Sequence, residues 1–186
     1  YERKNPAGLL HQGWKDSRMD HLGLKPPIEL IEVQGYYYAA LREAAEFALM
    51  LKDETLAKRL ASRSEKLKAI CLKEFWISDK NFFAIALSES KFPDERISSN
   101  PGHLLFSGIL EGEDDKIEAV VKRLFQDDMW TPYGIRTHAE SNPDFNPMSY
   151  HLGSVWPHDN WIIAQGLKKY GYDREYKKIK HALLDA

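Results

Sequence analysis

The feature that most constrains the fold is a repeated pairing of helical apolar stripes. In each stripe, apolar or small side chains recur every three or four residues, which is the spacing of one face of a helix. Polar turns or glycines separate the two stripes of each pair. The stripes occupy residues 32–52 and 56 to about 76, then 98–111 and 113–126, and finally 156–170 and 173–186. The sequence therefore predicts three helical hairpins.

The hairpins cannot stand alone, because each carries more apolar surface than it can cover by itself. Stacked hairpins form either an open solenoid or a closed toroid, and periodicity does not distinguish the two. Between the first and second hairpins, Asn81–Leu87 is short, aromatic and bounded by polar residues, which predicts one short strand or extended segment. We expect an all-α fold with at most this one β element, in a single domain over residues 1–186.

Composition excludes several classes of partner. With 26 basic and 28 acidic residues the net charge is −2, so nothing favours nucleic acid or an anionic membrane as the partner. The mean hydropathy is −0.52 and no long apolar run occurs, which argues against a membrane span. The single cysteine, Cys71, lies in an apolar stretch and is expected to be buried and reduced, which favours a cytoplasmic location. Because Tyr1 begins neither an initiator sequence nor a secretory signal, the start is expected to be an internal cut.

The loop of residues 11–20 is the first candidate for chemistry. It holds Asp16 and Asp20 beside Trp14 and Lys15, with a glycine pivot at Gly13. Cleavage of a glycosidic bond needs a carboxylic acid that protonates the leaving oxygen, and an apolar wall such as Trp14 raises the pKa of such an acid. Asp16 can serve as this acid. The alternative, which its local context alone favours, is that Asp16 caps a helix beginning near Ser17.

A second cluster lies at the start of the first predicted helix, where Glu32 and Gln34 precede several tyrosines. Both side chains can hydrogen-bond sugar hydroxyl groups. Alternatively, Glu32 is a first-turn glutamate that complements the helix dipole.

The third candidate region, residues 133–160, is a long loop rich in proline, asparagine and aromatic residues. A loop of this length and composition is expected to build the wall of a site. A cation, ring donors, stacking faces and an acceptor suitable for gripping a pyranose are supplied by Arg136, Tyr150, His151, Trp156 and Asp159. A metal site at His151, His158 and Asp159 is the rival interpretation, but no metal-binding motif accompanies these residues. Nucleotide-binding and serine-hydrolase motifs do not occur either.

Three blocks of this sequence resemble the glucosidase domains of glycogen-debranching enzymes, of the amylo-alpha-1,6-glucosidase type, and related (α/α)6-barrel glycosidases. The blocks are HQGWKDS at 11–17, IEVQGYYYAA at 31–40, and YGIRT at 133–137 with NPMSYHLGSVWPHDN at 146–160. The resemblance implies a toroid of six helical hairpins, of which this chain supplies about three. His11 stands where the family usually has asparagine, which leaves the sugar preference of the adjacent subsite open.

The resemblance also implies an activity. It implies inverting hydrolysis of an alpha-linked glucoside, such as the 1,6-linked branch stub of glycogen, without a metal or an organic cofactor. It places the general acid at Asp16 and the opposing glutamate base after Ala186, so the isolated chain is expected to have little or no activity. Substrate contacts are expected from the three blocks, at Trp14, Lys15, Glu32, Gln34, Arg136, Tyr150, His151, Trp156 and Asp159.

Two other classes of function fit parts of the same pattern. A carbohydrate-binding module would keep the aromatic groove and perform no chemistry. A helical-repeat scaffold that binds protein would use the stacked hairpins, but it predicts a polar terminal cap, whereas the last helix ends on apolar Ala182, Leu183 and Leu184. The oligomeric state is not predicted.

Overall fold

A computed structural model describes residues 4–5, 7–8, 11, 13–15 and 24–186 of the chain. Asp16, the predicted acid, lies outside the described residues. Six α-helices occur in the described part: α1 Ile31–Met50, α2 Glu54–Glu74, α3 His103–Ser107, α4 Asp114–Leu124, α5 Pro157–Lys169 and α6 Asp173–Leu184. The described residues also form two 3-10 helices, η2 Ser78–Lys80 and η3 Asn100–Gly102.

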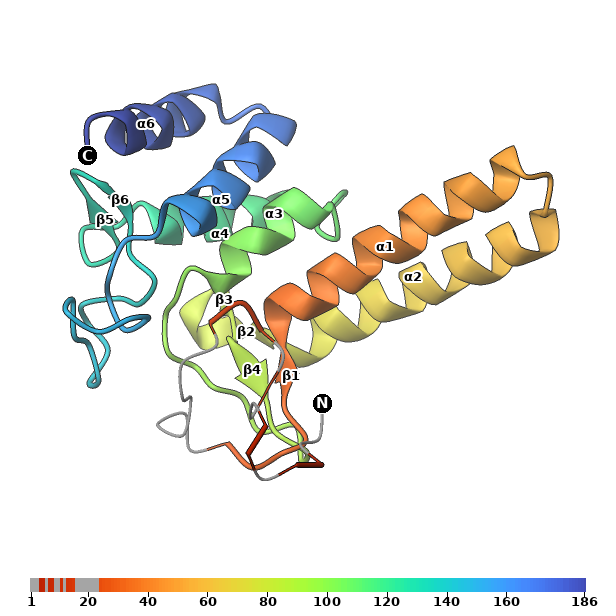
Figure 1. The fold of residues 1–186 in the computed structure, drawn as a ribbon, viewed down its shortest axis with the longest axis horizontal. Coiled ribbons are helices and arrows are strands. Elements are labelled where there is room, and N and C mark those ends of the chain that lie inside the picture. The colour runs from red at the N-terminus through yellow and green to blue at the C-terminus, as the bar shows by residue number, and fades with distance from the viewer. Residues whose placement is uncertain (1–3, 6, 9–10, 12, 16–23) are drawn as a thin grey trace.

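The first hairpin, α1 with α2, extends away from the remaining elements (Figure 1). The turn between α1 and α2 is stabilised at the end of α1 and at the start of α2. Lys52 takes a left-handed conformation with φ of 62°, and the Asp53 carboxylate accepts a hydrogen bond of 2.9 Å from the Leu56 amide at the start of α2. Cys71 on α2 is buried as expected, and burial raises the pKa of its thiol to about 12, so the thiol stays protonated.

The predicted helix over 98–111 is wrong in extent. Regular helix covers only η3 and α3, because Gly108 adopts a left-handed conformation with φ of 78° and ends α3 there. Residues 108–112 form turns that lead into α4. The apolar residues Ile109 and Leu110 continue the stripe but are buried from these turns, which explains why the spacing alone predicted a longer helix.

The expectation of a single β element is also wrong. Three two-stranded antiparallel sheets occur in the described part of the chain, and every strand has two residues. They pair β1 Glu29–Leu30 with β4 Ala86–Leu87, β2 Trp76–Ile77 with β3 Phe82–Phe83, and β5 Trp130–Thr131 with β6 Gly134–Ile135. Residues 82–87 are all at most 2% exposed, so their backbone groups need partners, and they find them on two different strands.

The first helices of the three pairs form one layer, in the order α1, α3, α5 (Figure 1). Small residues allow the close contacts. A Cβ on Gly166 of α5 would lie 2.5 Å from Leu105 Cβ, and a Cβ on Gly35 of α1 would lie 3.0 Å from Ser107 Oγ. The helices α2 and α6 pack against α1 and α5 respectively, as the predicted hairpins require. In the described part of the chain, no helix combines the length and the apolar character needed to cross a membrane.

Candidate active site

The amino ends of α1, α3 and α5 meet at one place. Each contributes a fully buried polar side chain from its first turn: Glu32 from α1, His103 from α3 and Asp159 from α5. Gly13, Trp14 and Lys15, the described residues that precede Asp16, lie against the same three helix ends. Residues separated by more than 140 positions therefore form one cluster.

His103 is the centre of this cluster. Its Nε2 atom lies 2.7 Å from Asp159 Oδ1, and its Nδ1 atom forms a short hydrogen bond with the hydroxyl group of Tyr36 on α1. The Trp14 ring stacks on the His103 ring, with centroids 5.8 Å apart and planes inclined by 23°. His103 thus links α1, α3 and α5 to Trp14.

Trp14 is surrounded by aromatic rings from the loop before α5 and from the first turn of α5. The His151, His158 and Trp156 rings lie edge-on to it at centroid distances of 5.1, 5.0 and 6.2 Å. Tyr150 packs on both His151 and Trp156, and its carbonyl oxygen accepts a hydrogen bond of 2.8 Å from Trp156 Nε1. The structure therefore brings together four of the predicted substrate-contact residues, Trp14, Tyr150, His151 and Trp156.

Lys15, the residue after Trp14, is buried. Its ammonium group donates a 2.5 Å hydrogen bond to the Thr137 carbonyl oxygen. Burial lowers the pKa of Lys15 to about 8, and the carboxylates of Asp159, Glu32 and Asp94 oppose that shift. Lys15 is thus the positive charge that balances the acidic groups of the cluster.

Glu32 has no exposed surface, and burial raises the pKa of its carboxyl group. The nearby Asn100 side chain, the His103 ring and Lys15 offset part of that rise. No donor among the described residues forms a hydrogen bond of normal geometry with either Glu32 oxygen. Asp159 Oδ2 likewise lacks a donor and Trp14 Nε1 lacks an acceptor, so four buried polar atoms in and beside this cluster have no described partner.

Two predicted contact residues serve local backbone instead. The Gln34 amide donates a 3.2 Å hydrogen bond to Leu30 O, one turn back on α1. The Arg136 guanidinium donates to Gly153 O at 3.2 Å and lies 5.2 Å from the centroid of the Phe145 ring. Arg136 therefore braces the loop before α5 through these two contacts, neither of which involves the helix-end cluster.

His103, Tyr36 and Asn100 are the members of the cluster that the sequence did not single out as site residues. In the sequence, Asn100 and His103 lie within the helix predicted over residues 98–111. A histidine that directly follows an Asn-Pro-Gly helix start, without a place on an apolar stripe, is the signal that could have marked it. In the described part of the chain, no three His, Cys, Asp or Glu side chains are grouped to hold a metal ion.

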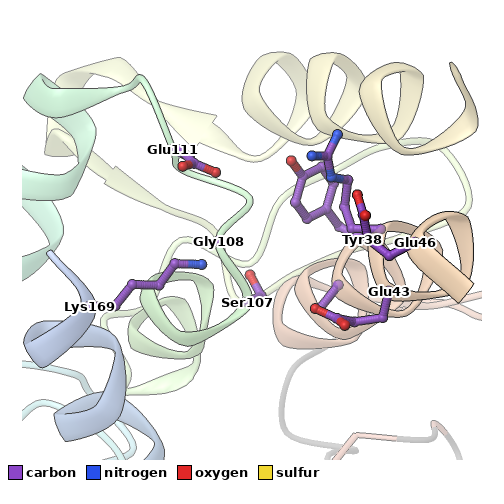
Figure 2. Close-up of a pocket in the computed structure, with 9 residues that line it drawn as sticks. Tyr38, Glu43, Glu46, Ser107, Gly108, Glu111 and Lys169 are labelled. Atoms are coloured by element: carbon purple, nitrogen blue, oxygen red, sulfur yellow. The ribbon is translucent and has the colours of Figure 1, made fainter. Parts of the chain in front are cut away.

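A separate pocket of about 270 Å³ lies near the other ends of α3 and α5. Figure 2 shows Lys169, from the last turn of α5, on one side of the turn at Ser107 and Gly108, and Tyr38, Glu43 and Glu46 of α1 on the other. Lys169 is ten residues after Asp159 on α5, which is about 15 Å along a helix. None of the predicted site residues lines this pocket.

Comparison with known proteins identifies a family. The family model for the mannosylglycerate hydrolase MGH1-like glycoside hydrolase domain matches residues 1–186. A mannosylglycerate hydrolase of Selaginella moellendorffii is 36% identical over 78 residues, which are 41% of this chain and 15% of the relative. The chain therefore spans only a small part of that curated relative.

Solved structures share the fold. The GH63 mannosylglycerate hydrolase of Thermus thermophilus, in complex with Tris and D-glycerate, aligns with a TM-score of 0.73 at 17% identity, over 85% of this chain and 37% of the other. A structure described as a sialidase aligns with a TM-score of 0.79 at 14% identity, over 99% of this chain and 18% of the other. The helix-rich architecture is consistent with part of a helical toroid. Because the family model spans the whole sequence, this chain belongs to the mannosylglycerate hydrolase MGH1-like family of glycoside hydrolase domains.

Proposed function

We propose that this domain carries the general acid of an inverting glycoside hydrolase, and that Asp16 is that acid. Asp16 protonates the glycosidic oxygen as the bond to the anomeric carbon breaks. A carboxylate base outside residues 1–186 takes a proton from the water whose oxygen attacks that carbon from the opposite face. The products are the free sugar with inverted configuration and the released alcohol.

One observation carries the proposal: Gly13, Trp14 and Lys15, the described residues that precede Asp16 in the sequence, lie against the buried cluster of Glu32, His103 and Asp159. Among the described residues, the two Glu32 oxygens and the nearby Trp14 Nε1 have no hydrogen-bond partner, and buried polar atoms in proteins are nearly always satisfied. Sugar hydroxyl groups are suitable partners. The Trp14 ring, held by His103 and His151, supplies the apolar surface that a sugar ring packs against.

For the substrate we propose a small alpha-linked glycoside of a hydroxy acid, of which mannosylglycerate is the prototype. The support comes from the family and from the curated relatives that bear this name. The T. thermophilus enzyme with the same fold was crystallised with D-glycerate. Hydrolysis of the 1,6-linked branch stub of glycogen, which the three sequence blocks suggested, is the alternative specificity.

The test uses two matched variants of the intact protein, Asp16→Asn and Asp20→Asn, which remove carboxylates four residues apart. Loss of a general acid is expected to lower kcat for mannosylglycerate by about 10²–10⁴-fold in Asp16→Asn, and Asp20→Asn should stay within a few-fold of the wild type. NMR of the first product formed should show the anomer opposite to that of the substrate. Retained turnover in Asp16→Asn, or a retained anomer, overturns the assignment.

The same protein distinguishes the remaining alternatives. Faster turnover of a branched maltooligosaccharide than of mannosylglycerate would assign the debranching specificity. Calorimetric binding of either sugar without any turnover would assign a binding module. If no sugar binds or reacts, a protein-binding scaffold becomes the better interpretation.

A further inference from the structure

Asp159 fixes which nitrogen of the His103 ring carries the proton. This sets the direction of the hydrogen bond between the ring and Tyr36. Asp159 Oδ1 lies 2.7 Å from Nε2, and the Tyr36 hydroxyl group lies on Nδ1. An ionised carboxylate only accepts hydrogen bonds, so a singly protonated ring that faces Asp159 carries its proton on Nε2. Nδ1 is then an acceptor, and the Tyr36 hydroxyl group must donate its only proton to it.

The Tyr36 oxygen is consequently left with lone pairs alone. Tyr36 lies on α1 one turn after Glu32, and both Glu32 and Asp159 act electrostatically on its hydroxyl group. The oxygen is therefore part of the helix-end cluster under Trp14. Tyr36 is also only partly buried, unlike Glu32, His103 and Asp159.

We propose that Asp159 acts through His103 to present Tyr36 as a hydrogen-bond acceptor for one hydroxyl group of the bound glycoside. Tyr36 is then a specificity-determining residue, and His103 and Asp159 are positioning residues that do not touch the substrate. The assignment of the glycoside as ligand rests on the proposed function, whereas the direction of the hydrogen bonds does not. Asp159, expected from the sequence to contact sugar, acts here from behind His103.

The protonation of the ring can be measured without any substrate, by 15N NMR of the imidazole groups. In the wild type, His103 should carry its proton on Nε2 only. In Asp159→Asn the amide can donate to Nε2, so the proton should move to Nδ1. Asp144→Asn is the matched control, because Asp144 Oδ1 holds the Nε2 atom of a different histidine, His138, at 2.8 Å. Asp144→Asn should leave the His103 signals unchanged. The signals that disappear in His103→Gln are those of His103.

Kinetics test the second part of the proposal, in which Tyr36 accepts a hydrogen bond from the glycoside. Asp159→Asn and Tyr36→Phe should each raise KM by about tenfold with kcat nearly unchanged. This is expected when the lost hydrogen bond is equally strong in the bound substrate and in the transition state. Asp159→Asn in a Tyr36→Phe background should add little further loss. Monodeoxy analogues of mannosylglycerate should include one for which Tyr36→Phe has no effect.

The outcomes separate the two proposals. A His103 ring protonated on Nδ1, or on both nitrogens, in the wild type overturns the relay whether or not the protein is a glycosidase. Multiplicative losses in the double variant, or a Tyr36→Phe effect on every deoxy analogue, overturn the acceptor role in an active enzyme. Correct NMR signals in a protein that neither binds nor cleaves glycosides would retain the relay and reject the proposed function.

Discussion

Gly13 lies so close to Glu32 that a side chain at position 13 would clash with the glutamate. A Cβ atom on Gly13 would stand 2.7 Å from Glu32 Oε1 and 2.4 Å from Leu30 Cδ1. Both neighbours are buried and have little room to move, since Leu30 directly precedes α1 and Glu32 lies in its first turn. The bare glycine backbone at position 13 therefore allows Gly13, Trp14 and Lys15 to approach the cluster.

Gly13→Ala is expected to push residues 13–15 away from α1, with a loss of about 1–3 kcal/mol of stability and at least a tenfold loss of kcat/KM. Urea unfolding and steady-state kinetics of the intact protein measure both. Gly112→Ala is the matched control, since Gly112 has φ of 84° and no atom within 4 Å of the Cβ that alanine would add. It should lose stability through backbone strain alone, with kcat/KM unchanged. Equal kinetic losses in the two variants would contradict the close-approach argument.

Glu32→Gln should stabilise the protein at neutral pH. Burial raises the folded-state pKa of Glu32 above 4.5, so the folded protein binds its proton more tightly than the unfolded chain does. Stability is then lost as the pH rises from about 4.5 through the raised pKa. The glutamine variant lacks this loss, so its advantage over the wild type should be small near pH 4.5 and should grow towards pH 7. Parallel unfolding curves at several pH values measure the difference, and an advantage that shrinks with rising pH would refute the direction of the shift.

Lys15→Met tests a pKa shift in the opposite direction, because burial lowers the pKa of Lys15. The folded-state pKa of Lys15 is about 8 against an ordinary value of 10.5, so the cost of burying its charge is fully present below pH 8. As the pH rises from 8 to 10.5 that cost disappears, and the wild type should gain about 3 kcal/mol relative to Lys15→Met. The comparison of the two proteins cancels the alkaline titration of other groups. A constant difference across this window would show that Lys15 titrates normally.

The loops that hold the Lys15 partner Thr137 depend on Arg96. Its guanidinium binds both Asp94 oxygens, at 2.9 and 2.8 Å, and reaches Asp144 across 48 residues of sequence. Because this network is largely buried, Arg96→Met should cost about 3–5 kcal/mol by leaving charged partners behind.

Arg42→Met is the control for that substitution. Arg42 lies 3.6 Å from Glu65, and both side chains are about half exposed. Its loss should cost less than about 1 kcal/mol in the same urea titration. Comparable losses for Arg42 and Arg96 would show that burial does not govern these ion pairs.

Much of the helical framework could be predicted from the sequence, because five stripes of regular apolar spacing correspond to α1, α2, α4, α5 and α6. The β pairs could not, because a two-residue strand has no period to detect. The helix over 98–111 was overestimated because buried turns after Gly108 keep the apolar spacing without the helical backbone.

For the site, the sequence indicated residues that stand in dense motifs, such as Trp14, Lys15 and Glu32. It did not indicate His103, whose partners Asp159 and Tyr36 lie 56 and 67 positions away. Such a residue has no local signature, because its role is defined by helices that meet only in three dimensions. Asp16 itself lies outside the described residues, so its role as the acid stays a prediction.

The hydrogen bond from Lys15 to Thr137 has a consequence for how the protein is made. It joins positions 122 residues apart, and the cluster also needs Asp159. Residues 13–15 leave the ribosome before the three helices whose amino ends they contact. Their docking place does not exist until α5 has emerged and a long chain loop has closed. The hairpin of α1 and α2 can form early from local contacts, whereas Trp14 and Lys15 can dock only after α5 has been made. Much of the described helical structure can therefore form before the cluster beneath Trp14 is complete.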